Sequence, residues 1–273
     1  MDRPAWAPDE VDMTSPSVAR VYDYYLGGSH NFEADREFAD RVLAELPDMA
    51  AIAQANRAFL RRAVHMLCAQ GVRQFLDLGS GIPTVGTVHE VARAAGADPR
   101  VLYVDNDPIA VAHSRALLAG DDATAVLAAD LTDPQRVMAD PATRAHLDLS
   151  EPVAVLLVSV LHFVPDSADP AGIVRGYAGA TAPGSHVVVS HASDEGGHTA
   201  ASRAQNVYNR DRSPNRMRMR DTEEVTALLG DLQPVDPGVV RIPLWRPECP
   251  VGPDAQRYPG LAVVARTAER PGT

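Results

Sequence analysis

The sequence predicts an α/β fold, a doubly wound and mostly parallel sheet of seven strands with an N-terminal helical cap. Between residues 73 and 191, short apolar runs alternate with amphipathic segments, which is the pattern of consecutive strand–helix units. Two further apolar runs, 239–244 and 261–266, are joined by a loop rich in proline. Because the prolines forbid a crossover helix, these last two runs predict an antiparallel pair.

Three helical patterns precede the first strand, so they are predicted to cap the alternating core: residues 15–26, 34–46 and 49–69. We therefore divide the chain into an arm and cap, residues 1–70, and a core, residues 71–273, that together form one compact unit. The cap offers side chains to line a ligand pocket: Tyr22, Tyr25, Asn31 and Arg62. The alternative is that the tyrosines pack between helices and the arginine is solvated.

The stretch 73–107 carries the most informative pattern. An apolar run leads into Gly79-Ser80-Gly81, an amphipathic segment follows, and a second apolar run ends in Asp105. This order of strand, glycine turn, helix and strand is typical of a nucleotide-binding unit. Glycines let the backbone close around a ligand, and a carboxylate at the second strand tip can accept hydrogen bonds from both ribose hydroxyls.

Three details of this stretch favour one nucleotide over others. Thr84 stands where the dinucleotide fingerprint requires its third glycine, so the pyrophosphate site is incomplete. Asp77, two residues before the first glycine, would repel a phosphate but can hold an ammonium group. Asn106 and Asp107 add polar side chains beside Asp105, where a ribose and a base edge would lie. S-adenosylmethionine fits all three features.

The third strand, residues 124–129, ends in Asp130-Leu131. A carboxylate at this strand tip is placed to accept a hydrogen bond from an exocyclic amine, and adenine carries one. The alternative is that Asp130 only caps the turn that follows, and its position alone does not decide between the two.

The next two strands each end in histidine. Strand 153–160 contains Ser159 and leads to His162, which we interpret as a general base or a substrate anchor beside the methyl group. Strand 185–191 ends in His191, which is predicted to face His162 across the cleft. A histidine bonded only to the backbone is the alternative. The spacing of metal-binding histidines is absent around both, so no metal site is expected.

The segment 192–220 departs from the regular alternation and combines Tyr208 with six arginines: Arg203, Arg210, Arg212, Arg216, Arg218 and Arg220. One interpretation is a solvated charged face. The other is a lid over the acceptor pocket, in which an arginine clamps a carboxylate or phosphate of the substrate.

Composition excludes several classes of function. All 25 basic residues are arginine, which rules out a lysine nucleophile, a Schiff base or a Walker lysine. A net charge of −11 disfavours nucleic acid as a substrate. Two distant cysteines argue against a disulfide framework or a zinc site and favour the cytoplasm. With no visible signal peptide, and 153–164 as the longest apolar run, no membrane partner is expected.

Several stretches resemble, in order, the actinobacterial S-adenosyl methyltransferase family that was long known only as a domain of unknown function: ARVYDYYLGGSHNFEADR, QFLDLGSGIPT, VLYVDNDP, VLLVSVLHFVPD, PGSHVVVSH and VRIPLWRP. The resemblance spans roughly residues 16 to 266. It implies a class I, Rossmann-like methyltransferase with S-adenosylmethionine as cofactor. It implies no particular acceptor, and we expect a small molecule.

The pattern and the resemblance together predict the site. The predicted donor-binding residues are Asp77, Gly79, Ser80, Gly81, Pro83, Thr84, Asp105, Asn106, Asp130, Leu131 and Ser159. His162 is the catalytic candidate, and the substrate-binding candidates are Tyr22, Tyr25, Asn31 and His191. Two alternatives stay open at this point, a nicotinamide-dependent oxidoreductase and a non-catalytic module that binds the nucleotide.

Overall fold

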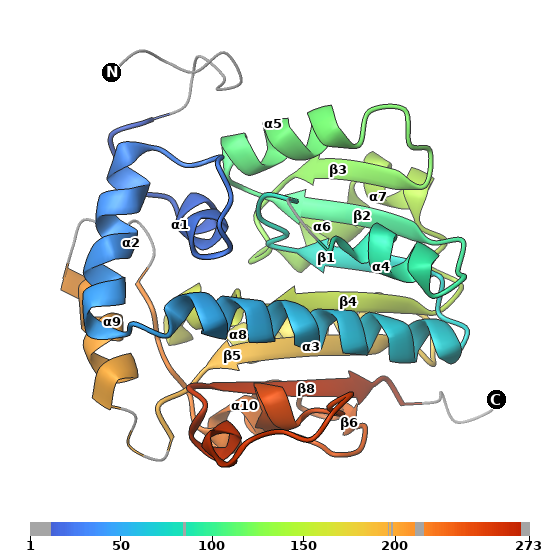
Figure 1. Cartoon of the computed structure of the whole chain (residues 1–273). Coiled ribbons are helices and arrows are strands. Elements are labelled where there is room, and N and C mark those ends of the chain that lie inside the picture. The colour runs from blue at the N-terminus through green and yellow to red at the C-terminus, as the bar shows by residue number, and fades with distance from the viewer. Residues whose placement is uncertain (1–11, 84–85, 196, 198, 211–215, 269–273) are drawn as a thin grey trace.

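The computed structural model describes residues 12–83, 86–195, 197, 199–210 and 216–268. Within these residues, eight strands form one mixed sheet in the order β3-β2-β1-β4-β5-β8-β6, and β7 also pairs with β8 (Figure 1). The strands are β1 (Gln74–Leu78), β2 (Arg100–Asp105), β3 (Thr124–Ala128), β4 (Val153–Val158), β5 (His186–Ala192), β6 (Gln233–Pro234), β7 (Val240–Arg241) and β8 (Gly260–Arg266).

Strands β1 to β5 run parallel, so their carboxyl ends meet at one edge of the sheet. Strand β1 lies between β2 and β4, and the direction of chain progression reverses there. In open α/β sheets such a reversal leaves a crevice beyond the strand ends, which is where ligands bind. The end of β1 with its glycine turn therefore lies at the centre of the fold.

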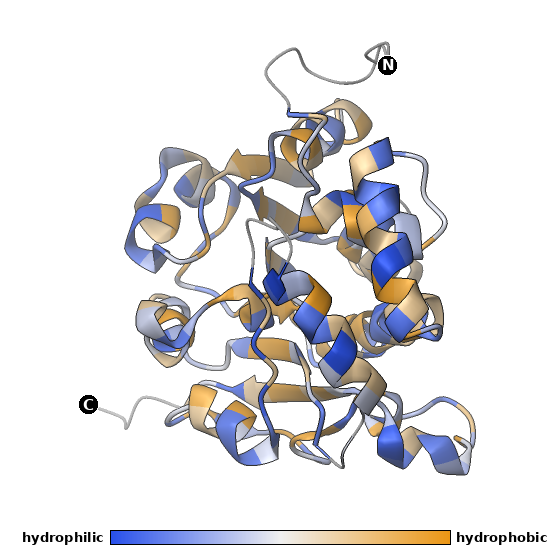
Figure 2. Cartoon of the chain, turned by 90° about the vertical axis from the view of Figure 1, so that its left-hand side faces the viewer, coloured by the Kyte–Doolittle hydropathy of each residue, from blue (hydrophilic) through white to orange (hydrophobic). Residues whose placement is uncertain are grey.

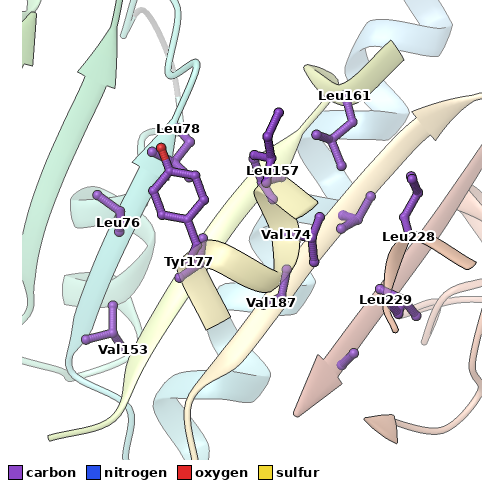
Figure 3. Close-up of a cluster of buried hydrophobic side chains, with 14 of the residues drawn as sticks. Leu76, Leu78, Val153, Leu157, Leu161, Val174, Tyr177, Val187, Leu228 and Leu229 are labelled. Atoms are coloured by element: carbon purple, nitrogen blue, oxygen red, sulfur yellow. The ribbon is translucent and has the colours of Figure 1, made fainter. Parts of the chain in front are cut away.

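Two layers of helices cover the sheet because its central strands are apolar on both faces. One face packs against α3 (Met49–Ala69) and α4 (Val88–Ala94). The other packs against α6 (Pro134–Ala139), α8 (Pro170–Gly179) and α10 (Thr222–Leu228), and Figure 3 shows Tyr177 and Val174 of α8 against this second face. Short α7 (Pro141–His146) and α5 (Pro108–Leu117) contact β2 and β3 at the sheet margin.

The alternation of side chains along β1 decides which way its acid points. Leu76 and Leu78 belong to the cluster on the α8 face, whereas Phe75 belongs to the cluster on the α3 face. Successive side chains of a strand point to opposite faces, so Asp77 shares the face of Phe75. Its carboxylate is thereby directed toward α3.

A third apolar cluster lies at the carboxyl edge of the sheet. Helices α1 (Val18–Tyr25), α2 (Glu33–Glu45) and α9 (Thr199–Arg210) gather there, at the left of Figure 1. Figure 2 views the molecule from this side, where the helices carry both hydrophilic and hydrophobic residues. We call this group the cap. The cap thus contains α9 as well as the first two helices of the chain.

A buried ion cluster joins the cap to the core. Arg20 of α1 donates from Nε to Asp35 of α2 over 2.8 Å, and its Nη1 lies 3.6 Å from the carboxylate of Asp107. The same Asp107 carboxylate accepts hydrogen bonds from Ser17 and, at its other oxygen, from the first turn of α5. Arg20 and Asp35 are buried, so removing one partner of this cluster would leave an uncompensated charge.

The predicted architecture is confirmed, with local corrections. The helical patterns correspond to α1, α2 and α3, and the antiparallel return is formed by β8. Only Val240–Arg241 of the predicted strand 239–244 pairs with β8, because Pro243 lies in the 3₁₀ turn that follows. The two-residue strand β6 was missed by the prediction. No described helix has the length and apolar character needed to cross a membrane.

Candidate active site

A cavity of about 570 Å³ lies between the carboxyl edge of the sheet and the cap. Its floor is formed by the turns that follow β1, β2, β3 and β4 together with Arg57 of α3, and its roof by side chains of the cap and of the start of α3. We call these two parts the donor side and the cap side. The volume is in the range of small-molecule sites.

The glycine turn after β1 forms the middle of the donor side. Gly79 and Gly81 have φ of +68° and +65°, a region that glycine enters without strain. The N–H groups of Gly79 and Ser80 both donate to the carbonyl of Val104, at 2.8 and 3.2 Å, which folds the turn against β2. A Cβ on Gly79 would lie only 2.4 Å from Val160 Cγ1, so glycine is required there.

Asp105 fixes this turn from the tip of β2. Its Oδ2 accepts from the Gly81 N–H at 2.8 Å and its Oδ1 from the Asp107 N–H at 2.8 Å. Burial raises the pKa of Asp105, while these backbone donors oppose the shift. A carboxylate oxygen accepts more than one hydrogen bond, so both oxygens retain capacity for a ribose hydroxyl. Asn106 lies next to it on the cavity wall.

Asp77 and Arg57 form the polar end of the donor side. Burial raises the pKa of Asp77 to about 7, the negative charge of Asp105 adds to the shift, and the cation of Arg57 opposes it. Arg57 lies on α3 with its guanidinium 5.7 Å from the ring centre of Tyr22, and its buried Nε has no hydrogen-bond partner among the residues that the structure describes. The site thus presents a carboxyl group and a guanidinium cation together.

Arg57 was missed by the sequence prediction, which chose Arg62 instead. The sequence signal that could have found Arg57 was its position on the helix. Arg57 stands four residues after Ala53 and three before Leu60, so it shares a helix face with these two buried residues. Arg62 donates to the carbonyls of Trp245 and Ile242, at 2.8 and 2.9 Å, and does not line the cavity.

Asp130 both caps a turn and lines the cavity. Its Oδ1 accepts from the N–H and the hydroxyl of Thr132, each at 2.8 Å, as the capping interpretation requires. Asp130 and Leu131 also contribute to the cavity wall beyond β3. The two interpretations are therefore compatible.

Beyond β4, Ser159 has an unusual backbone conformation, with φ of +59°. Its N–H donates to the hydroxyl and to the carbonyl of Ser190 in β5, at 2.9 and 3.2 Å. The Ser190 hydroxyl in turn donates to Asn56 of α3 at 2.6 Å. Hydrogen bonds of this kind hold Ser159 in its strained backbone conformation. A buried polar chain therefore connects the tip of β4 to α3.

His191 lines the cavity, but both of its ring nitrogens are occupied. Arg220 donates from Nη1 to Nε2 at 2.9 Å, and arginine can only donate, so Nδ1 carries the proton and donates to the carbonyl of Ala192 at 2.8 Å. Burial lowers the pKa of His191 to about 4, so the ring is neutral. No ring nitrogen of His191 remains to contact a substrate.

His162 has the opposite tautomer. Its Nδ1 accepts from the N–H of Ala192 at 3.4 Å, so in the neutral ring Nε2 carries the proton. Burial lowers the pKa well below its ordinary value, and His191 and Arg220 add to this shift. Within the described part of the chain, Nε2 has no hydrogen-bond partner. His162 therefore offers the cavity a donor and not a proton acceptor.

The described arginines of segment 192–220 do not line the cavity. Arg220 is buried, and besides His191 it donates to the carbonyls of Leu161 and Val164 and pairs with Asp166 at 2.6 Å. Arg203 and Arg218 form exposed ion pairs with Glu45 and with Asp166 and Glu224. Arg210 and Arg216 are exposed, and Arg212 lies outside the described residues. Among the described arginines, the solvated interpretation fits Arg203, Arg210, Arg216 and Arg218, and Arg220 is the buried exception.

Most of the other predicted residues are brought to the cavity: Tyr22, Tyr25, Asp77, Gly79, Ser80, Gly81, Asp105, Asn106, Asp130, Leu131, Ser159, His162 and His191. Asn31 is not, because its amide donates to Asp23 and to the Gly28 carbonyl, each at 3.0 Å. Pro83 is buried away from the cavity wall. Thr84 lies outside the described residues.

Fold and site together define a class I, Rossmann-like methyltransferase. The chain belongs to the S-adenosyl methyltransferase family, which it matches over residues 4–268. It is therefore an enzyme that depends on S-adenosylmethionine, and the oxidoreductase and the non-catalytic module are ruled out.

Solved structures agree with this assignment. A candidate methyltransferase from Thermobifida fusca YX is 40% identical, with a TM-score of 0.91 over 97% of this chain and 100% of the other. A DUF574 family protein from Streptomyces avermitilis is 36% identical, with a TM-score of 0.88 over 94% and 99%.

A more distant structure shares the fold alone. The N-methyltransferase NodS from Bradyrhizobium japonicum, in complex with S-adenosylhomocysteine, is 15% identical, with a TM-score of 0.52 over 92% of this chain and 100% of the other. No curated protein matches the sequence.

Proposed function

We propose that the enzyme transfers the methyl group of S-adenosylmethionine to a small molecule that binds between the sheet edge and the cap. The observation that carries this proposal is the division of one cavity into a polar donor side and an apolar cap side. The net charge of −11 supports a small acceptor over a nucleic acid. The predicted cytoplasmic location and the division at residue 70 stay predictions.

The donor side fits the chemistry of S-adenosylmethionine. Its methionine end carries an ammonium and a carboxylate, and the Asp77 carboxylate and the Arg57 guanidinium are complementary to these two charges. The buried Nε of Arg57 has no hydrogen-bond partner among the described residues, as expected of a group that binds a ligand. We assign the ammonium to Asp77 and the carboxylate to Arg57.

The other assignments follow from the order of the strand tips. The turn Gly79-Ser80-Gly81 lies beside Asp77, and Asp105 with Asn106 is placed for the ribose. Asp130 and Leu131, one strand further out, are placed for the adenine, and Ser159 lies between this donor side and the acceptor. Each assignment uses a residue that lines the cavity.

The residues of this chain act by positioning and by exclusion of water. When bound, the donor supplies a methyl group that is already activated as a sulfonium. The protein holds donor and acceptor in line, and positioning of this kind can supply several kcal/mol of the barrier, up to about 7–11 kcal/mol in the best-oriented systems. The apolar cap side keeps water from the reacting atoms.

Calorimetric titration with S-adenosylhomocysteine tests the donor assignment. We expect Arg57→Ala to weaken binding by about 1.5–3 kcal/mol, the usual contribution of a hydrogen bond to a charged group. Arg61→Ala is the matched control, because Arg61 is on the same helix but forms an exposed ion pair with Glu248. Equal affinity of the two variants would remove Arg57 from the site. Binding of NAD in preference to S-adenosylhomocysteine would overturn the donor site as a whole.

A further inference from the structure

The cap side of the cavity is lined mainly by aromatic and other apolar side chains that come from several separate segments. Tyr22 and Tyr25 belong to α1, Phe163 to the turn after β4, and Tyr208 to α9. The rings of Phe163 and Tyr208 lie 5.7 Å apart. The other apolar members of this wall include Val42, Leu46, Met49, Ile52, Met217 and Met219. Aromatic and methionine side chains of this kind suit a flat apolar ligand.

The hydroxyls of the three tyrosines already form hydrogen bonds within the protein. Tyr22 donates to the Ala53 carbonyl at 3.2 Å and accepts from Asn56 at 3.0 Å. The hydroxyls of Tyr25 and Tyr208 bond to each other at 3.4 Å. Burial raises the pKa of all three, that of Tyr208 to about 12, so they stay neutral and protonated. None of them is a ready base for an acceptor.

Charge is also absent from the described part of the cap side. The acids that line the cavity, Asp77, Asp105, Asp107 and Asp130, all stand at strand tips or turns of the donor side. Arg57 is the one cation among the described lining residues, and it faces Asp77. A charged acceptor would therefore be buried without a partner, which is strongly unfavourable.

The two histidines complete this picture. His191 has no ring nitrogen left, and His162 lines the cavity with an Nε2–H that has no partner among the described residues. The described cap side thus contains a hydrogen-bond donor but no group that can take a proton from the acceptor. A phenol or an alcohol must lose its proton to become a good nucleophile, whereas a neutral nitrogen already has a free lone pair.

We propose that the acceptor is an uncharged aromatic amine or nitrogen heterocycle that is methylated on nitrogen, with a second acceptor atom held by His162 Nε2–H. This proposal rests on the proposed donor site. Aromatic nitrogens fit better than aliphatic amines because they are weakly basic and enter an apolar cavity without first losing a proton.

The transfer balances without a base. The nitrogen lone pair forms the new N–CH₃ bond, and the S–CH₃ bond breaks with both electrons passing to sulfur. The positive charge moves from sulfur to nitrogen, where the faces of the surrounding aromatic rings stabilise it. Where the nitrogen carries a hydrogen, that proton leaves to bulk water once the methylated product is released from the cavity.

A set of three probes of matched shape tests this inference: 6-aminoquinoline, 6-hydroxyquinoline and quinoline-6-carboxylic acid. Each is incubated with the enzyme and S-adenosylmethionine, and the methylated atom is assigned by mass spectrometry and NMR. We expect N-methyl products from the uncharged probes and none from the acid. A methyl ether or a methyl ester as the main product would overturn the proposal.

Binding measured separately distinguishes the possible failures. The probes are titrated into the enzyme saturated with S-adenosylhomocysteine. If S-adenosylhomocysteine itself does not bind, the donor site is wrong. If it binds but none of the probes does, or if a probe binds without methylation of nitrogen, the acceptor proposal is wrong and the donor site stands.

Two variants test the role of His162 with the best probe. Glutamine keeps an N–H donor without a basic ring nitrogen, and alanine keeps neither. We expect His162→Ala to raise KM about 3- to 10-fold, the effect of one neutral hydrogen bond, and His162→Gln to restore most of this loss, with little change in kcat for either. A large and equal loss of kcat in both variants would show a base and would overturn the assignment.

Discussion

The two sides of the cavity are built in different ways. On the donor side, Asp77, Gly79 and Asp105 lie at or next to strand ends, and backbone hydrogen bonds within the turns fix them. On the cap side, Tyr25 and Tyr208 meet through their hydroxyls although 183 residues separate them in the sequence. Donor recognition is thus a local property of the backbone, whereas acceptor recognition depends on side chains that only tertiary packing brings together. The cap side can change its specificity without disturbing the turns that bind the donor.

The largest effect is expected from adding a methyl group to the glycine turn after β1, on the donor side. Gly79→Ala combines the left-handed conformation, about 1–2 kcal/mol, with overpacking against Val160, about 1–3 kcal/mol. Gly81→Ala is the matched control, because its φ is similar but its Cβ would meet no atom within 4 Å. Denaturant unfolding should show the larger loss for Gly79→Ala. Equal losses would mean that the contact with Val160 relaxes freely.

Removal of the β2 carboxylate should have the next largest effect. Asp105→Ala removes the groups that hold the N–H of Gly81 and of Asp107 and that are placed for the ribose. We expect S-adenosylhomocysteine to bind more weakly by about 1.5–3 kcal/mol in calorimetry. Asp122→Ala, an exposed carboxylate before β3, should leave the affinity unchanged. Unchanged affinity in Asp105→Ala as well would refute the ribose assignment.

The pKa of Asp77 sharpens the comparison, because it makes donor binding depend on pH. The pKa is raised to about 7, so below this pH the free protein carries a neutral carboxyl and loses the partner of the ammonium. Affinity should rise as pH increases through about 7, and between pH 8 and pH 6 we expect a loss of roughly tenfold, or about 1.4 kcal/mol. Calorimetry at several pH values measures this dependence. A wild-type curve that matches the curve of Asp77→Asn would contradict it.

The smallest effect is expected from a change confined to the cap side. Tyr208→Phe removes the hydrogen bond to Tyr25, worth about 0.5–1.5 kcal/mol of unfolding free energy, and keeps the ring. S-adenosylhomocysteine affinity should not change, because the donor side contains neither residue. Tyr24→Phe, which removes an exposed bond to Asp40 outside the cavity, is the control. Altered donor affinity in Tyr208→Phe alone would mean that the two sides are not separate.

The sequence predicts most of the fold because most elements have a clear period. Helix α3 and the buried strands β1 and β4 are strongly patterned. Strand β6 has two residues, one of them Pro234, and so carries no alternation to detect. The predicted strand 239–244 was too long because its apolar composition continues through Pro243, where the pairing stops.

The limits of the site prediction follow the same division. Asp77 and Asp105 reach the cavity because a strand end fixes their position. Arg57 was missed in favour of Arg62 because the prediction did not follow the helical phase of α3, which places Arg57 with the buried Ala53 and Leu60. The prediction for Asn31 was wrong because its side-chain amide donates a hydrogen bond to the buried Asp23, which stands eight positions earlier in the sequence.

The carboxylate of Asp107 has one further consequence. It follows the end of β2, caps α5 with one oxygen, and with the other contacts Ser17 and Arg20 of the cap. This carboxylate therefore links the turn beside Asp105 to α1, which carries Tyr22 and Tyr25. If binding beside Asp105 stabilises this link, thermodynamic reciprocity requires that each substrate raise the affinity for the other by the same factor. The methyl donor and the acceptor are then expected to bind cooperatively through the Asp107 carboxylate.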